Sequence, residues 1–221
     1  MLSVNLMPTI IEGRTVRLEP LTLDHVPDLF RAGGDDDEVW RWLSVPTPRT
    51  EDELRRLVEE ELAEQGKGCA LWAVVLRDTG RAVGQTSYLD ISARDERLEI
   101  GGTWYGRGVW RTAVNTEAKL LLLTHAFEEW GVGRVQWKTH HGNVRSQEAI
   151  ARLGAQREGV LRRHRAMPDG TWRDSVYYSM LADEWPAAKE RLRRRLASGG
   201  SAGVDAVGGA APVGAGGRTA V

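Results

Sequence analysis

The stretch from Leu98 to Trp130 contains the residues best suited to chemistry in this chain of 221 residues. It reads LEIGGTWYGRGVWRTAVNTEAKLLLLTHAFEEW, an apolar strand that leads through a glycine-containing loop into a long helix. The helix start carries no carboxylate before Glu117, so its free N–H groups and positive dipole end favour an anion. Arg107 and Arg111 add positive charge in the loop. The segment predicts a site for a phosphorylated cofactor, and an ordinary helix start is the alternative.

Elements of alternating periodicity must position this segment. Period-two runs bounded by turn residues predict seven strands, at 15–19, 69–76, 81–91, 97–105, 134–139, 160–167 and 171–181. Period-3.6 runs with capping signals predict four helices. The first covers residues 23–32, the second begins after Thr50, the third ends near Trp130 and the fourth covers residues 143–153. A strand, helix, strand unit needs a crossover, so 97–105 and 134–139, the fourth and fifth strands, are expected to be parallel. The fold class is therefore α/β (α+β), a mixed and mostly antiparallel seven-stranded sheet flanked by helices.

Composition sets the limits within which this fold can act. Lys plus Arg number 30 and Asp plus Glu 31, so the net charge of -1 gives no general reason to expect nucleic acid or an acidic membrane as a partner. No apolar run reaches the ~18 residues of a membrane span, and the first ten residues do not resemble a signal peptide. The lone Cys69 forms no internal disulfide, and no histidine and carboxylate spacing matches a metal site. We expect a cytoplasmic protein without a metal.

Composition also divides the chain into one domain with two terminal additions. Residues 1–14 are interpreted as an extension that leads into the first strand, and residues 15–197 as a single domain of ordinary size. Residues 198–221 are almost wholly Gly, Ala, Ser, Val and Pro, which is too few large apolar residues to offset the entropy of ordering. The last segment is predicted to be a disordered Gly/Ala-rich tail.

The element order, with a phosphate-binding turn between the fourth strand and the third helix, resembles the GNAT acyltransferases. The resemblance covers about residues 15–185. Within the superfamily, the sequence is similar to the RimJ/RimL-like branch, which is named after ribosomal-protein N-terminal acetyltransferases. Four segments carry it: EGRTVRLEPLTLDH, NTEAKLLLL, NVRSQEAIARLGAQREGVLRRH and PDGTWRDSVYYSML. It implies a GNAT fold and an acetyl-CoA-dependent N-acetyltransferase, whose acceptor is a protein N-terminus or a small-molecule amine attacked directly. A non-catalytic acyl-CoA-binding or regulatory module is the alternative, and a homodimer is a possible assembly.

The resemblance also assigns a coenzyme A site, with departures from the usual motif. The family loop is Arg or Gln, two residues, Gly, one residue, then Gly or Ala, followed in this branch by Thr-Glu-Ala. Alignment on residues 116–118 places Trp110, Ala113 and Asn115 at the three motif positions. Backbone N–H groups can still hold the pyrophosphate, but Ala113 tolerates a positive φ less well than Gly. The cofactor-binding residues implied are Arg111, Thr112, Ala113, Val114, Asn115, Thr116, Asn143 and Ser146.

Acyl transfer to an amine needs a proton acceptor and, optionally, an acid for the departing thiolate. The resemblance suggests Glu99 as general base, and alternation places it on the strand face opposite Leu98 and Ile100. An outward carboxylate paired with an arginine is the alternative, and Asp95, Glu96 or water could replace it. Ser146 is the candidate acid, one turn after Asn143, because the tyrosine that many GNAT enzymes carry farther along is Ile150 here. For Asn143 the alternative is a simple helix cap.

The expected acceptor wall comes from aromatic residues and histidines. The resemblance places Trp40 and Trp42, in the loop after the first helix, and Tyr105 around the acceptor, and most of the nine tryptophans are otherwise expected in the core. His140 follows a strand whose end should splay from its parallel neighbour, and it could face the acceptor or act as a base. Residues 35–38 (DDDE) are read as a solvated loop, with recognition of a cationic substrate as the alternative. The predicted substrate-binding residues are Trp40, Trp42, Tyr105 and His140.

Overall fold

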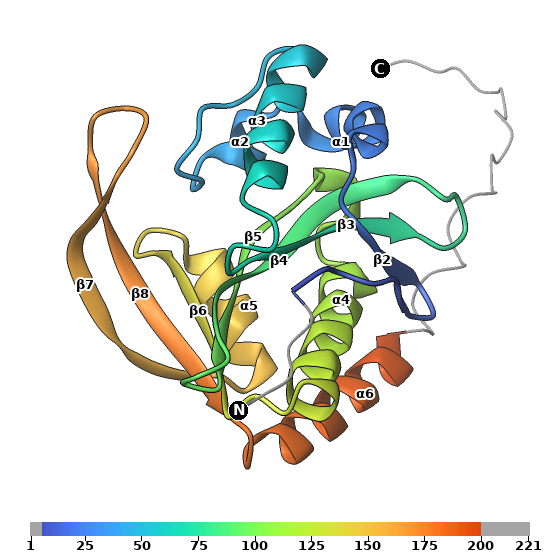
Figure 1. Ribbon diagram of the computed structural model, residues 1–221, viewed down its shortest axis with the longest axis vertical. Helices are drawn as coiled ribbons and strands as arrows, with labels where there is room; N and C mark the ends of the chain where they lie inside the picture. Colours follow the sequence, from blue (N-terminus) through green and yellow to red (C-terminus); the bar gives the residue numbers. More distant parts are fainter. Residues whose placement is uncertain (1–5, 200–221) are drawn as a thin grey trace, which may run out of the picture.

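An eight-stranded sheet runs through the structure, a computed structural model that describes residues 6–199 (Figure 1). The strands lie in the order β1-β2-β3-β4-β5-β6-β8-β7, so only the last two exchange places. Their bounds are β1 Ile11–Glu12, β2 Val16–Pro20, β3 Ala70–Leu76, β4 Ala82–Ser92, β5 Arg97–Tyr105, β6 Arg134–His140, β7 Gln156–Ala166 and β8 Trp172–Leu181.

All neighbouring strands are antiparallel except β5 and β6, which confirms the predicted parallel pair in a mostly antiparallel sheet. That pairing covers only residues 97–99 and 134–136. The predicted sheet had seven strands, and β1 is the eighth because residues placed in the N-terminal extension pair with β2. The carbonyl of Thr9 also accepts a hydrogen bond from Trp72 Nε1 at 2.8 Å. Residues 9–12 therefore pack with the domain.

Six α-helices and three short helical turns complete the described chain. The α-helices are α1 Val26–Gly33, α2 Asp37–Trp40, α3 Glu51–Ala63, α4 Ala113–Thr124, α5 Val144–Leu153 and α6 Trp185–Gly199; the turns are η1 Leu23–His25, η2 Arg107–Val109 and η3 His125–Glu129. None of the helices within residues 6–199 is long and apolar enough to cross a bilayer.

Three helical boundaries differ from the sequence prediction. The segment 23–32 divides into η1 and α1 because Pro27 stands in the first turn of α1, a position that suits proline. Asp36 caps α2, so Trp40 ends a short helix where the sequence predicted a loop. Ser198 and Gly199 continue α6, which shortens the predicted tail, and residues 200–221 lie outside the described residues.

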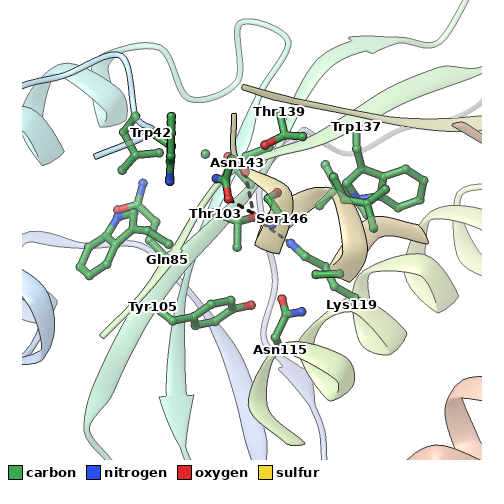
Figure 2. Close-up of a pocket in the computed structure, with 18 of the residues that line it drawn as sticks. Trp42, Gln85, Thr103, Tyr105, Asn115, Lys119, Trp137, Thr139, Asn143 and Ser146 are labelled. Carbon is green, nitrogen blue, oxygen red and sulfur yellow. Dashed lines mark hydrogen bonds between the residues drawn. The ribbon is translucent and has the colours of Figure 1, made fainter. Parts of the chain in front are cut away.

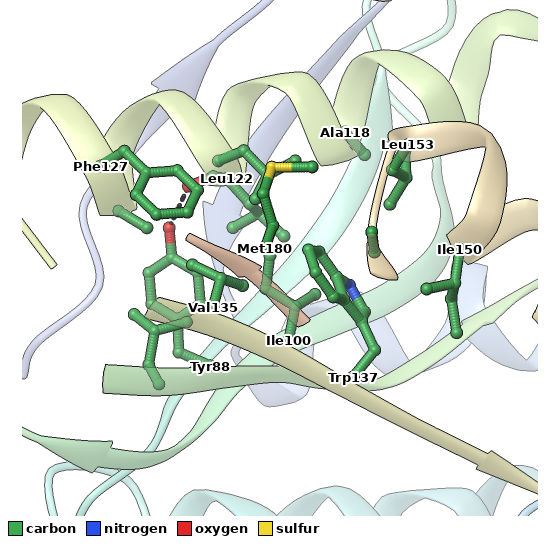
Figure 3. Close-up of a cluster of buried hydrophobic side chains, with 14 of the residues drawn as sticks. Tyr88, Ile100, Ala118, Leu122, Phe127, Val135, Trp137, Ile150, Leu153 and Met180 are labelled. Atoms are coloured by element: carbon green, nitrogen blue, oxygen red, sulfur yellow. Dashed lines mark hydrogen bonds between the residues drawn. The ribbon is translucent and has the colours of Figure 1, made fainter. Parts of the chain in front are cut away.

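Helices cover both faces of the sheet. Side chains of α4, α5 and α6 form one core with one face, and side chains of α1, α2 and α3 form a second core with the other. Figure 3 shows the first core, where the Tyr88 hydroxyl donates to the Leu122 carbonyl at 2.5 Å among Trp137 and Met180. Ile150, at the position where many GNAT enzymes have tyrosine, belongs to this core and is 7% exposed.

Glu117 is a buried carboxylate that fastens α4 to the chain before β2. Its Oε1 accepts the N–H of Arg14 at 2.8 Å, and its Oε2 accepts those of Thr15 and Val16 at 2.6 and 2.8 Å. Its exposure is only 7%. Three backbone donors satisfy a charge that burial would otherwise destabilise.

Lys119, half a turn farther along α4, is a buried cation. Its Nζ donates to the hydroxyls of Thr86 on β4 and Thr103 on β5 at 3.0 and 2.7 Å, and the side chain is 5% exposed. Among the described residues it has no carboxylate partner within salt-bridge distance. Burial lowers the pKa of Lys119 to about 7.

We expect Glu117→Gln to lower the free energy of unfolding by about 2–4 kcal/mol, because an NH2 group replaces one accepting oxygen and leaves backbone donors buried without a partner. Urea unfolding followed by circular dichroism measures this loss. The matched control is Glu59→Gln on the exposed side of α3, which should change stability by less than about 0.5 kcal/mol. Equal urea midpoints for the two variants would contradict the anchoring role of Glu117.

We expect Lys119→Met to stabilise the protein, most strongly at and below pH 7. Unfolded lysine titrates near pH 10.4, so between about pH 7 and that value the unfolded chain binds a proton that the folded chain has lost. The wild type therefore gains stability as pH rises through this window, by at most about 1.4 kcal/mol per pH unit. Unfolding midpoints at pH 6, 7, 8 and 9 measure the gap between variant and wild type. A gap that does not narrow above pH 7 would show that Lys119 stays charged.

Candidate active site

A cavity of about 1160 Å³ opens where β5 and β6 separate (Figure 2). The end of β5, from Ile100 to Tyr105, and residues 137–139 of β6 line it, and both lie beyond the three paired positions. Side chains of α3, α4 and α5 close its sides. The predicted splaying of the β6 end is therefore confirmed, and it makes room for a ligand within the sheet.

The first turn of α4 forms one end of the cavity. Thr112 is the N-cap, and its hydroxyl accepts the N–H of Val114 at 3.3 Å. The first turn contains no acidic residue. Of the predicted cofactor-binding residues in this loop, Arg111, Thr112, Asn115 and Thr116 line the cavity, whereas Ala113 and Val114 do not.

The departure at Ala113 carries no conformational cost. Ala113 is the first residue of α4, and the positive φ of this loop, 63°, belongs to Arg111. A positive φ, which alanine tolerates less well than glycine, is therefore not required at position 113. The chain turns at Arg111, two residues earlier, so the helix can begin with an ordinary residue.

Trp110 takes part in a contact that the sequence did not predict. Its Nε1 donates to the Tyr105 carbonyl at 2.7 Å, and the guanidinium of Arg145 lies 3.5 Å from the centre of its ring. Arg145 comes from the first turn of α5 and lines the cavity. Burial lowers the pKa of Arg145, and the nearby Arg111 acts in the same direction. Arg111 and Arg145 thus lie near the α4 end, whereas Arg107, the other arginine that the sequence placed in this loop, does not line the cavity and pairs with Asp36.

Two buried polar atoms of the cavity wall lack partners in the described chain. The Tyr105 hydroxyl and the Trp137 Nε1 have almost no exposed surface and no hydrogen bond. Burial raises the pKa of Tyr105, so it remains a neutral donor. In Figure 2 the hydroxyl of Tyr105 points toward Asn115 at the start of α4. Buried donors without partners are uncommon, so these atoms favour a polar ligand in this space.

Asn143 and Ser146 lie together at the start of α5. Asn143 is the N-cap, and its Oδ1 accepts the Ser146 N–H at 3.1 Å, as the capping alternative predicted. Both side chains line the cavity (Figure 2). The Ser146 hydroxyl is half-buried and makes no hydrogen bond within residues 6–199, so it can bind a ligand.

Glu99 lies on the sheet face opposite Leu98 and Ile100, as alternation predicted, and lines the cavity. It is buried, with 1% exposure, where the alternative reading expected an outward carboxylate. Its partner is a lysine: Oε2 accepts from Lys138 Nζ at 2.8 Å and from Gln136 Nε2 at 3.5 Å. The ammonium of Lys138 is therefore the counter-ion of this carboxylate. The cavity thus contains a carboxylate that can attract a cationic amine.

Of the four predicted acceptor-binding residues, three line the cavity and one does not. Trp40, Trp42 and Tyr105 line the cavity, although Trp40 is nearly buried against Trp104 and donates to the Gly33 carbonyl at 2.6 Å. His140 is not among the lining residues. Its ring lies tilted against Trp42 with 4.7 Å between centres, and burial lowers its pKa. We therefore place His140 behind the wall.

The acidic segment 35–38 is neutralised by arginines. Arg49 pairs with Asp35 and Asp37 at 2.9 and 2.5 Å, Arg107 pairs with Asp36 at 2.6 Å, and Arg41 pairs with Glu38 at 3.5 Å. None of the four carboxylates lines the cavity. The segment therefore gives no support to a recognition site for cations.

Sequence reasoning missed several charged residues of the cavity. Lys119 and Arg145 come from helices, Arg165 and Arg173 from β7 and β8, and Glu61 from α3. Glu61 accepts a hydrogen bond from Gln85 Nε2 at 2.5 Å, and burial raises its pKa. The one available signal was a charge within an apolar pattern, as at Lys119 between Ala118 and Leu120. Residues 6–199 contain no cluster of side chains that could hold a metal ion.

The comparisons with known proteins agree with this geometry. Residues 15–156 match the family model described as "Acetyltransferase (GNAT) domain". A Bacillus subtilis relative named "Putative ribosomal N-acetyltransferase YdaF" is 28% identical over 181 residues, which are 80% of this chain and 96% of the relative. A GCN5-related N-acetyltransferase from Brucella melitensis is similar in structure, with 31% identity, a TM-score of 0.80 and 85% of each chain covered.

A solved structure of RimJ from Mycobacterium smegmatis, in complex with CoA-disulfide, also has a similar fold. It is 21% identical, with a TM-score of 0.74, and the match covers 85% of this chain and 95% of that one. At this identity the likeness to RimJ concerns the fold alone. The family match over most of the sheet and the cavity at the separation of β5 and β6 lead to one conclusion: this chain belongs to the GNAT acetyltransferase family, whose members use acetyl-CoA.

Proposed function

We propose that this protein transfers the acetyl group of acetyl-CoA to a primary amine. One observation carries the proposal: a single cavity joins a cationic end at the start of α4 to the buried carboxylate of Glu99 on the opposite sheet face. The first end suits phosphates and the second suits an amine. The separation of β5 and β6 gives the two ligands a place to meet.

The residues of the α4 end fit coenzyme A. Backbone N–H groups at the start of α4, with Arg111 and Arg145, would hold the phosphates. The unpaired Tyr105 hydroxyl and Trp137 N–H, with Asn143, offer hydrogen bonds to the polar groups of an extended arm. Bound acetyl-CoA supplies a thioester carbonyl, which is an electrophile for amines. Trp110 replaces the usual first motif residue and supports Arg145 instead.

Glu99 is the proposed proton acceptor. The amine nitrogen attacks the thioester carbonyl carbon, the N–C bond forms and the C–S bond breaks. As the N–C bond forms the nitrogen becomes strongly acidic, so the carboxylate of Glu99, which is paired with Lys138, can accept its proton. The departing thiolate takes a proton from the Ser146 hydroxyl or from water, since Ile150 is in the core and supplies none.

The acceptor is a protein N-terminus or a small-molecule amine. The name of the Bacillus relative supports the first, because it refers to ribosomal acetylation. Two contacts beside the cavity support an acceptor that enters end-on. Ser44 Oγ lies 4.0 Å from Met167 Sδ of the segment joining β7 and β8, and the ring of Trp42 lies tilted against that of His140. A homodimer and a cytoplasmic location stay predictions.

We expect Glu99→Gln to lower kcat/KM about 100-fold and to remove the acidic limb of the pH profile, because the amide cannot accept the proton. Thiol release from acetyl-CoA with a panel of amines measures the rate. Because the change leaves Lys138 unpaired, the double variant Glu99→Gln/Lys138→Met is measured beside it, with unfolding midpoints for both. An unchanged rate and pH profile would exclude Glu99 as the base. Binding of acetyl-CoA by the wild type without turnover of any amine would favour the non-catalytic module.

We expect Arg145→Gln to raise the KM for acetyl-CoA about tenfold with little change in kcat, because it removes a charge-assisted contact to phosphate that is made before and during the reaction. Steady-state kinetics and calorimetric titration with coenzyme A measure the effect. Arg56→Gln on the exposed side of α3 is the matched control, since Arg56 does not line the cavity. Equal affinities of both variants for coenzyme A would place the phosphates elsewhere.

A further inference from the structure

Two arginines face each other across β7 and β8 without an acidic partner. Arg165 and Arg173 are directly paired in the register of the two strands, so their side chains leave the sheet side by side. Both line the cavity. Neither is within salt-bridge distance of a carboxylate in the part of the chain that the structure describes. Like charges directly opposite each other destabilise a sheet, so stability of the fold does not explain why these two arginines are paired.

Hydrogen bonds hold Arg173 in one orientation. Its Nε donates to Ser175 Oγ at 2.9 Å, and the same hydroxyl contacts His164 Nδ1 at 2.9 Å. The two terminal nitrogens of Arg173 donate to no side chain within residues 6–199, although the residue is only 7% exposed. These two nitrogens form the fork that binds a carboxylate or phosphate in a bidentate manner.

The charge balance of this wall favours an anion. Glu99 is the carboxylate whose charge acts on Arg173. Its Oε2 already pairs with Lys138 Nζ at 2.8 Å. Burial and the neighbouring Arg165 lower the pKa of Arg173, while the charge of Glu99 acts in the opposite direction. Burial, with Lys138, Arg165 and Arg173, also lowers the pKa of His164 and keeps this supporting ring neutral.

The arginine pair lies on the acceptor side of the sheet. Val176 and Tyr178 of β8 belong to the core beneath α4 and α5, so Arg173 and Ser175, which alternate with them, face the other way. Glu99 faces that same way, because Leu98 and Ile100 are in the α4 core. Figure 1 shows β7 and β8 on the far side of β6 from α4, where the cofactor phosphates are proposed to bind. The pair is therefore unsuited to the cofactor phosphates.

From this geometry we infer that Arg165 and Arg173 bind an anionic group of the acceptor, so the preferred acceptor is an amine that also carries a carboxylate or phosphate. The inference rests on the proposed acetyltransferase function and narrows its acceptor. The amine lies toward Glu99 and the oxyanion toward the arginines, which orients the nitrogen. An acceptor without the anion leaves two cations uncompensated and binds more weakly.

Matched amine pairs that differ only in the anion test this inference. L-amino acids are compared with their carboxamides, O-phosphoethanolamine with ethanolamine, and a peptide with an acidic second residue with its neutral counterpart. We expect kcat/KM to be about tenfold or more higher for the anionic member of the best pair. The amine pair that shows the preference identifies the anion as carboxylate or phosphate and its source as a small molecule or a peptide. A preference in any of the three amine pairs supports the arginine site.

Arg165→Gln should reduce this preference to near one, because it should raise the KM of the anionic acceptor about tenfold more than the KM of the uncharged acceptor. Arg165 is exposed, so the variant should fold, whereas Arg173→Lys serves as a second variant at the buried position. Arg162→Gln, also exposed on β7 but outside the cavity, is the matched control. An equal rate for both members of every pair, or a preference that survives in both variants, would overturn the inference.

A binding measurement separates this inference from the proposed function. Calorimetric titrations with acetyl-CoA and with each anionic amine are made on the wild type and on Arg165→Gln. Failure to bind acetyl-CoA would overturn the proposed function, and turnover of uncharged amines without an anion preference would overturn only the arginine site. If no amine is turned over, binding of an anionic amine that is lost in Arg165→Gln supports the site, and equal or absent binding overturns it.

Discussion

The parallel pairing of β5 and β6 governs the rest of this structure because it is so short. Only residues 97–99 and 134–136 pair, while β5 continues to Tyr105 and β6 to His140. A longer ladder would close the sheet and leave no cavity, because neighbouring strands lie only about 4.8 Å apart. A pairing that was absent would separate the β1 to β5 half from β6, β8 and β7. The three residue pairs hold the halves together at one end and leave the other end open.

Helix α4 keeps this opening in a fixed shape. It connects β5 to β6, so it must cross one face of the sheet, and Glu117 ties it to the backbone before β2, four strands away from β6. Lys119 ties the same helix to β4 and β5 through two threonine hydroxyls. These polar contacts sit among apolar ones, where each requires a defined partner and position. They fix the start of α4 relative to the gap, and thus the cofactor end relative to Glu99.

Periodicity and capping signals predict most of the fold because they report local constraints. The alternation around Glu99 correctly assigns its sheet face, and Asn143 and Gly154 bound α5 as expected. Residue pairs that meet only through topology leave no local signal. β1 contains two residues and exists through pairing with β2, and the partner of Glu99 is Lys138, 39 positions away in the chain.

The residues of the candidate site also divide into those with a local sequence signal and those that meet only in the folded chain. The α4 end could be predicted because a helix start without acidic residues is a local feature, and four of its six predicted loop residues line the cavity. Arg145 could not, because its position depends on the ring of Trp110, which approaches α5 only in the folded chain. Arg165 and Arg173 are separated by a hairpin, and only the register of β7 and β8 shows that they oppose each other. Local sequence signals therefore locate the proposed cofactor end of the cavity better than the proposed acceptor end.

Charge links the two ends of the cavity in energetic terms. Lys119 in the wall and Arg173 on β8 are cations that burial removes from water, and within residues 6–199 neither has a carboxylate in salt-bridge distance. Both positions therefore bear a desolvation cost. Arg145 near α4 is exposed and bears less of this cost. In the proposed function an oxyanion of the acceptor would compensate the buried charge of Arg173, so binding of that acceptor and folding stability would be coupled. The cofactor phosphates would meet Arg145 at the α4 end, so the two ligands would act on separate charges of one cavity.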